Sequence, residues 1–220
     1  FFTFQQIAFL VDARRGEANV PALLEYLLFV SFFPQLIAGP IVHHREILPQ
    51  LRSEQFAVLT SKTMVLGLAW LAIGLAKKTL IADQIAQISD KAFGAASLAD
   101  ATPSFFEAWF GALAFAFQIY FDFSAYSDMA IGLGIMFGVL LPLNFAAPYR
   151  ATSIIEFWHR WHMTLSRFLR DYLYFALGGN RKGTFRRYTN LMTTMALGGL
   201  WHGAAFTLVI WGALHGVYLM

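Results

Sequence analysis

The chain has 220 residues, of which 58% are hydrophobic and 13% are charged, and its formal net charge is +3. An average soluble domain carries roughly 25% charged residues, so this composition indicates a membrane protein. The lack of cysteine excludes disulfides, thiolate nucleophiles and thiolate metal sites. The small positive charge falls between apolar runs, where it sets topology and contacts lipid headgroups, and nucleic acid is not an expected partner.

The chain begins at Phe1 and ends at Met220, in each case inside an apolar stretch. We therefore expect an internal piece of a longer polypeptide, with 1–220 forming a single transmembrane domain that is truncated at both ends. A second apolar helix is predicted to start near Pro21. Pro34 should break this helix, because proline removes a backbone donor and clashes with the preceding turn.

The next predicted span is 63–82, an apolar stretch long enough to cross the hydrocarbon core. Lys77 and Lys78 lie near its end, where we expect them to snorkel towards the membrane surface. The mixed stretch 83–104 is predicted to be an extramembrane loop.

An aromatic-rich span is predicted at 105–123. The polar stretch 122–128 then predicts a tight break. A further span punctuated by glycine is expected from Met129 to 141.

The region 154–175 has a different pattern. Apolar side chains recur at spacings of four and three along it, which is the stripe of one amphipathic helix; they are Ile154, Trp158, Trp161, Leu165, Phe168 and Tyr172. Its arginines make it too charged to span, so it should lie along the interface or re-enter the bilayer partway. The following loop, 178–187, is rich in arginine and lysine and is predicted to be cytoplasmic.

The final run, 188–220, contains no Asp, Glu, Lys or Arg. As one helix it would be roughly 50 Å long, against a hydrocarbon core of roughly 30 Å, so two segments are predicted. Two GxxxG pairs, Gly199 with Gly203 and Gly212 with Gly216, predict close approach of neighbouring helices.

His202 lies in this run, within the sequence Trp201-His202-Gly203. An imidazole at bilayer depth is costly unless it faces a protein interior or a wet cavity, so we expect an enclosed functional site around it. His215 is expected to be a hydrogen bonder in helix packing. On one straight helix the two rings would lie about 20 Å apart and could not act on the same atom.

His159 and His162 are three residues apart and are predicted to share a helix face, with His162 on the inward stripe. No HExxH pattern completes a metal site, and none is predicted. The sequence also has no GxSxG elbow, Walker A loop or dinucleotide fingerprint. Intramembrane imidazoles suit proton abstraction from a hydroxyl or thiol, or transient acyl transfer.

Five blocks together resemble the membrane-bound O-acyltransferase (MBOAT) family, in particular the bacterial branch that O-acetylates alginate. They follow the family's order over nearly the whole chain and are specific as a group; they are 1–6, 31–51, 118–131, 156–179 and 198–216.

This resemblance implies an all-α integral membrane fold, a multi-helix bundle with re-entrant or interfacial helices around a central funnel. The family's two functional histidines correspond to His162 and His202, with His202 as the catalytic base, and Trp161 and Trp201 are expected to be walls of the substrate path. The implied reaction moves acetyl groups from acetyl-CoA on the cytoplasmic side towards hydroxyls of an exported polysaccharide such as alginate. No tightly bound cofactor is expected. The implied setting is the bacterial inner membrane, crossed several times, with membrane lipid, the polysaccharide acceptor and periplasmic acetyl-transfer proteins as partners.

Three alternatives remain open at this point. Within the same enzymatic class, the acceptor would be peptidoglycan, teichoic acid or a lipid, with acyl or D-alanyl groups transferred. A proton-coupled transporter would use His202 as a proton relay and the break at Pro34 as a substrate site. A non-catalytic scaffold would use the GxxxG pairs only for assembly.

Overall fold

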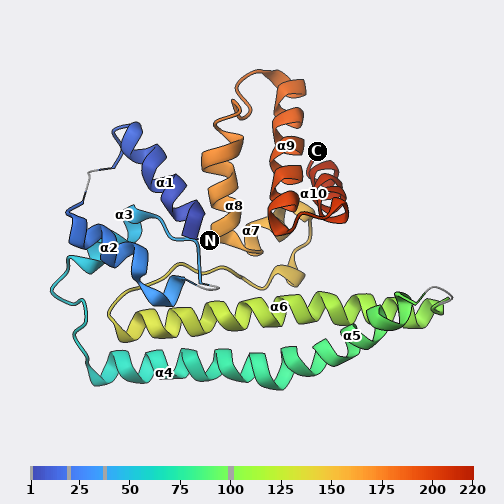
Figure 1. Ribbon diagram of the computed structural model, residues 1–220, viewed down its shortest axis with the longest axis horizontal. Coiled ribbons are helices and arrows are strands. Elements are labelled where there is room, and N and C mark those ends of the chain that lie inside the picture. Colours follow the sequence, from blue (N-terminus) through green and yellow to red (C-terminus); the bar gives the residue numbers. More distant parts are fainter. Residues whose placement is uncertain (1, 19–20, 37–38, 99–101) are drawn as a thin grey trace. The chain divides into compact units, whose positions relative to one another are not determined.

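The computed structural model describes residues 2–18, 21–36, 39–98 and 102–220, and every regular element in these ranges is helical. The all-α prediction is therefore confirmed for the described residues (Figure 1). The chain divides into two compact units. The first unit is Pro21–Pro142, and the second consists of 2–18 together with Leu143–Met220.

The first unit begins with short helices around an apolar core and continues into two long helices. Its elements are α2 (Leu23–Ser31), the 3-10 turn η1 (Phe33–Gln35), α3 (His44–Leu51), α4 (Ser61–Ala76), the π-helical turn η2 (Lys77–Ala82), α5 (Asp83–Ala96) and α6 (Phe105–Met136). The break predicted at Pro34 is confirmed, since α2 ends at Ser31. The side chain of Gln35 donates to the carbonyl of Phe29 at 2.6 Å, and so satisfies a backbone group at the interrupted end.

One helical stretch, Ser61–Ala96, is long and apolar enough to cross a membrane, and among the described residues it alone meets both criteria. It combines α4, η2 and α5, so the loop predicted for 83–104 is wrong over 83–96. One of the small residues that suggested a loop, Ala92, is a contact position. A Cβ on Gly111 of α6 would lie 2.6 Å from the Cβ of Ala92, which shows how closely α5 packs on α6.

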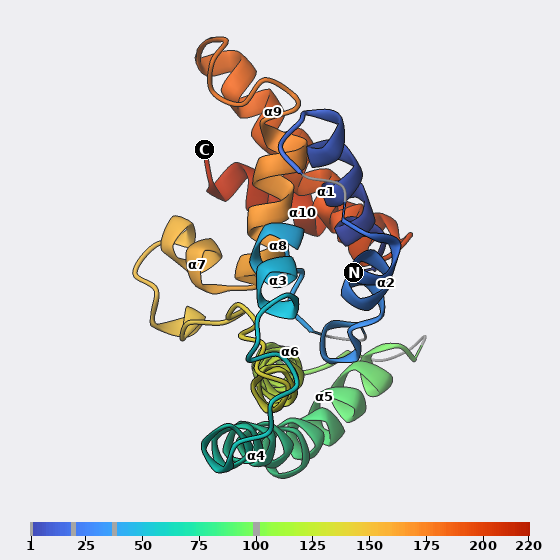
Figure 2. The ribbon, with the colours of Figure 1, turned by 90° about the vertical axis from the view of Figure 1, so that its left-hand side faces the viewer.

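Helix α6 is continuous over 32 residues, so the break predicted at 122–128 is wrong. Its polar residues face the neighbouring helix: Asp128 accepts a hydrogen bond from the ammonium of Lys77, and a Cβ on Gly74 would lie 2.7 Å from the carbonyl oxygen of Ala125. Figure 2 shows α4 and α6 side by side, close to end-on. A partner in η2 thus stabilises a polar side chain of α6 that, read along the sequence alone, suggests a helix end.

The two lysines of η2, which are predicted to snorkel, have carboxylate partners within the protein. Lys77 pairs with Asp128, and Lys78 lies 2.6 Å from a carboxylate oxygen of Asp122 and 2.7 Å from one of Asp83. π-Helical turns within α-helices occur frequently at functional sites. Here it places successive lysines against carboxylates of α5 and α6.

The second unit contains the two candidate histidines. Its elements are α1 (Phe2–Arg14), the 3-10 turn η3 (Pro148–Arg150), α7 (Ile154–Arg160), α8 (Met163–Phe168), the π-helical turn η4 (Leu169–Tyr174), α9 (Gly183–His202) and α10 (Phe206–Tyr218). The prediction that 188–220 contains two segments is confirmed, since the chain turns between α9 and α10 (Figure 1).

Glycines set the distance between α9 and α10. A Cβ on Gly199 would lie 2.2 Å from the carbonyl oxygen of Leu208, and one on Gly212 would lie 2.3 Å from that of Met195. A Cβ on Gly216 would approach the sulfur of Met192 to 3.0 Å. The close approach predicted from the GxxxG pairs is confirmed, and the first members of the two pairs face each other across the hairpin.

Candidate functional site

The single helix predicted over 154–175 is interrupted at its centre. Helix α7 ends at Arg160, α8 begins at Met163, and His162 between them has a left-handed backbone with φ of 41°. The prediction that His159 and His162 share one helix face is therefore wrong. The interruption is compensated from outside the helix, because the amide of Ala146 donates to the carbonyl of Arg160 at 3.0 Å.

His162 is 2% exposed and lies in this interruption, outside the candidate membrane span. Burial lowers the pKa of its imidazole to about 3, and the charge of the nearby His202 acts in the same direction. The ring is therefore neutral at physiological pH. The structure thus brings the two predicted histidines within electrostatic range of each other.

Three polar side chains form a buried cluster at the start of α8. The Thr164 hydroxyl donates to Oδ1 of Asn144 at 2.7 Å, and Nδ1 of His162 lies 3.3 Å from the same oxygen. All three residues are at most 2% exposed. Sequence reasoning missed Asn144 and Thr164. The available signal was a lone amide, Asn144, in an otherwise apolar stretch.

His202 ends α9 and lies between two indole rings. Its ring centroid is 4.9 Å from Trp201 and 5.5 Å from Trp211, and both pairs are edge-on. His202 is exposed in the described structure. The expectation that the protein encloses this ring is therefore not met by the described residues, which leave it accessible at the turn between α9 and α10.

The α9–α10 hairpin also changes the relation between His202 and His215. Trp211 contacts both rings, at 5.5 Å and 4.7 Å between centroids. The separation of about 20 Å that one straight helix would give does not apply, because α9 ends at His202 and α10 begins at Phe206. His215 accepts a hydrogen bond from the indole nitrogen of Trp158 at 3.3 Å, which agrees with its expected packing role.

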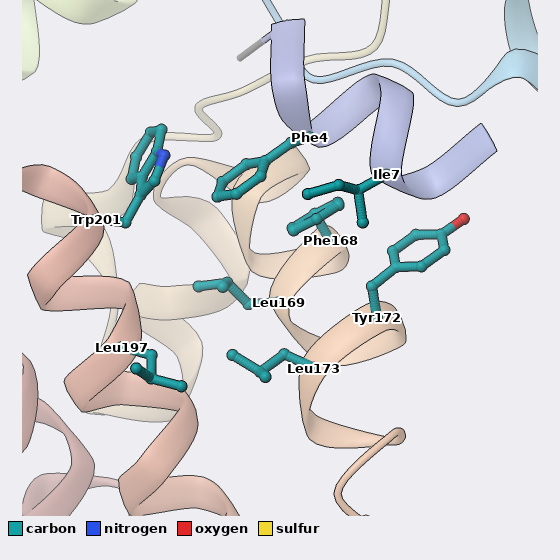
Figure 3. Close-up of a pocket in the computed structure, with 8 residues that line it drawn as sticks. All are labelled: Phe4, Ile7, Phe168, Leu169, Tyr172, Leu173, Leu197 and Trp201. Carbon is teal, nitrogen blue, oxygen red and sulfur yellow. The ribbon is translucent and has the colours of Figure 1, made fainter. Parts of the chain in front are cut away.

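An apolar cleft of about 280 Å³ lies beside Trp201 (Figure 3). Phe4 lies between Trp201 and Phe168 in this view, with ring centroids 5.1 Å and 4.2 Å away. The cleft is lined by side chains of α1, α8, η4 and α9, namely Phe4, Ile7, Phe168, Leu169, Tyr172, Leu173, Leu197 and Trp201. Trp201 therefore has the position of a wall residue, next in sequence to His202.

Trp161 has other surroundings. Its ring stacks on Phe157 at 5.5 Å and meets Phe145 edge-on at 5.1 Å. It is not among the residues that line the cleft. Its predicted role as a wall of the substrate path stays a prediction.

A buried carboxylate binds Tyr172, one of the residues that line the cleft. Asp12 of α1 is 3% exposed and accepts a hydrogen bond from the Tyr172 hydroxyl at 2.8 Å. This bond ties α1 to η4, the two elements that supply Ile7 and Leu173 to the cleft. Among the described residues, no group of three His, Asp or Glu side chains is arranged to hold a metal ion.

Several known proteins are similar to this chain over its whole length. A peptidoglycan O-acetyltransferase of Helicobacter pylori is 47% identical over 244 residues, which cover 100% of this chain and 46% of that protein. The probable alginate O-acetylase AlgI of Pseudomonas aeruginosa is 47% identical over 220 residues, which cover 100% of this chain and 41% of that protein. A teichoic acid D-alanyltransferase of Bacillus subtilis is 26% identical over 230 residues, which cover 100% of this chain and 56% of that protein.

The chain thus spans about half the length of these relatives. The sequence model of the membrane-bound O-acyltransferase family matches residues 6–220, a range that includes both candidate histidines and the cleft beside Trp201 except Phe4. On this match, the chain belongs to the membrane-bound O-acyltransferase family.

Proposed function

We propose that the protein is an integral inner-membrane O-acyltransferase that moves acetyl groups from cytoplasmic acetyl-CoA towards hydroxyls of an exported cell-envelope polysaccharide. The observation that carries this proposal is that a buried, neutral His162 and an accessible His202 lie in the same compact unit. Family membership favours acyl transfer over the transporter and scaffold alternatives.

The proposed chemistry assigns His202 as the general base. Its neutral imidazole takes the proton of the hydroxyl that receives the acetyl group, on the polysaccharide or on an intermediate carrier, while that hydroxyl oxygen attacks the thioester carbonyl. A carbon–oxygen bond forms, the carbon–sulfur bond breaks, and the imidazolium returns its proton to the leaving thiolate. The exposure of His202 supports this role because the acceptor must reach its ring.

His162 is proposed as the second histidine of the site, and Trp201 as the wall that lies beside the acyl group. The apolar cleft beside Trp201 supports the latter assignment. Trp161 is proposed as a wall only through the family resemblance. The central funnel, the several membrane crossings, and the periplasmic transfer proteins that would complete attachment are parts of the same proposal.

Two acceptors have equal support among the relatives. A probable alginate O-acetylase and a peptidoglycan O-acetyltransferase are both 47% identical to this chain. An alginate-like exopolysaccharide, the acceptor that the motif blocks imply, and peptidoglycan are therefore the two candidates. The D-alanyl transferase is only 26% identical, which favours acetyl transfer over D-alanyl transfer.

The test is radiolabelled acetyl transfer in membranes that contain the full-length protein. Label from acetyl-CoA is collected separately from exported polysaccharide and from isolated peptidoglycan, so the same assay identifies the acceptor. His202→Ala should reduce transfer by about 100-fold or more, the contribution expected of a general base. The amount of the His202→Ala variant in the membrane should match that of the unmodified protein.

His159→Ala is the matched control, because His159 is an exposed histidine outside the proposed site. This variant should transfer acetyl groups at the normal rate. Normal transfer by His202→Ala would refute the assignment of the base. Solute movement by the reconstituted protein without any acyl donor would favour the transporter.

A further inference from the structure

Asn144 holds the start of α8 through both of its carbonyl oxygens. Its backbone oxygen accepts from the amide of Met163 at 2.9 Å, and its side-chain Oδ1 accepts from the amide of Thr164 at 3.4 Å. These amides belong to the first turn of α8, where backbone donors have no partner within the helix. Asn144 therefore caps α8 from another segment, next to the left-handed residue His162.

The backbone amide of Thr164 fixes which side-chain atom of Asn144 faces the cluster. Oxygen and nitrogen of an asparagine amide are distinguished by their hydrogen-bond partners. A backbone amide can only donate, so the atom opposite it must be the acceptor Oδ1 and not the amide nitrogen. The Thr164 hydroxyl donates to this same oxygen.

The orientation of Asn144 determines the tautomer of His162. Nδ1 of His162 lies 3.3 Å from Oδ1 of Asn144. Because Oδ1 can only accept, Nδ1 must carry the hydrogen. A neutral imidazole has one N–H and one lone pair, so the lone pair of His162 is on Nε2.

We propose that Asn144 is a positioning residue that holds His162 as the Nδ1–H tautomer and directs its Nε2 lone pair towards the reaction site. The role of that lone pair in the reaction rests on the proposed function. The tautomer itself follows from the hydrogen bonds alone. Asn144 is 1% exposed, and it acts on His162 without any contact with substrate.

The first experiment measures the tautomer directly. The full-length protein, labelled with ¹⁵N and ¹³C at histidine, is studied by solid-state NMR in membranes without an acyl donor. Ring chemical shifts distinguish the two neutral tautomers, and the His162 signal is assigned by its loss in His162→Gln. The expected result is the Nδ1–H form, and an Nε2–H form in the unmodified protein would overturn the proposal.

Variants separate positioning from folding. Asn144→Leu removes the acceptor and should give a mixed or Nε2–H population, with acetyl transfer reduced about 10- to 100-fold, as is usual when the partner that orients a functional histidine is lost. Asn144→Asp keeps an acceptor oxygen at that place and should retain the Nδ1–H form. Retention of the Nδ1–H form in a folded Asn144→Leu protein would also overturn the proposal.

Asn190→Leu is the matched control. Asn190 is a second buried asparagine of the same unit, and its side chain donates to the carbonyl of Gly179 at 2.9 Å. Its substitution should lower stability and leave the tautomer of His162 unchanged. The tautomer measurement needs no turnover, so it stands whether or not the acetyl-transfer assay confirms the proposed function.

Discussion

The α9–α10 hairpin offers a sharp test of how packing controls the position of His202. In Gly199→Ala, the new Cβ would lie 2.2 Å from the carbonyl oxygen of Leu208, where ordinary contact begins at 3.4 Å. The obstacle is backbone, which no side-chain rotation can remove, so the two helices must separate by about 1 Å. Overpacking of this kind typically costs about 1–3 kcal/mol. His202 lies three residues further along the same helix.

The measurement is thermal unfolding of the full-length protein in detergent, combined with the acetyl-transfer assay. Gly199→Ala should lower the midpoint by several degrees and reduce transfer. Gly94→Ala is the matched control, because a Cβ on this helical glycine meets nothing within 4 Å, and the exchange should stabilise α5 by up to about 1 kcal/mol. If Gly199→Ala unfolds at the same temperature as the unmodified protein and transfers acetyl groups normally, the helix contact does not position His202.

Three further predictions address the remaining polar contacts. Lys77→Met should destabilise the protein more than the double variant Lys77→Met/Asp128→Leu does, because the single change leaves the Asp128 carboxylate without its ion-pair partner between helices. Thermal unfolding of the two variants compares them, and equal midpoints would contradict this prediction. Tyr172→Phe leaves the buried carboxylate of α1 without this hydrogen bond and should cost about 1–3 kcal/mol in the same assay. The backbone amide of Thr152 lowers the pKa of Glu156 below 4.5. The ionised Glu156 carboxylate therefore stabilises α7 above pH 4.5, and this stabilisation is lost as the pH falls through the lowered pKa. Glu156→Gln should therefore make the unfolding midpoint less sensitive to acid.

Much of the architecture could be predicted from local patterns. The break at Pro34 follows from the chemistry of proline, and the division of 188–220 into two segments follows from its length against the bilayer thickness. The GxxxG pairs correctly indicated where α9 would approach a neighbour. Such features depend on residues that lie close together in the sequence.

Polar residues in helices were misread for one physical reason. Asp128 suggested a break in α6, and Lys77 suggested an exposed helix end, because each is costly in an apolar setting when it stands alone. Each is the partner of the other, 51 residues apart along the chain. No local pattern reveals a hydrogen bond over that separation.

The class of the protein follows from local features of the sequence, because its apolar runs, its glycine pairs and its ordered motif blocks are properties of neighbouring residues. The surroundings of the two histidines, by contrast, depend on how the chain folds. The tertiary structure interrupted the helix at His162, and Asn144 caps the first-turn amides that have no partner within α8. The tertiary structure also folded α10 back so that Trp211 contacts both His202 and His215. Side-chain chemistry at a site depends on groups brought together by folding, and helical periodicity describes only the residues of one element.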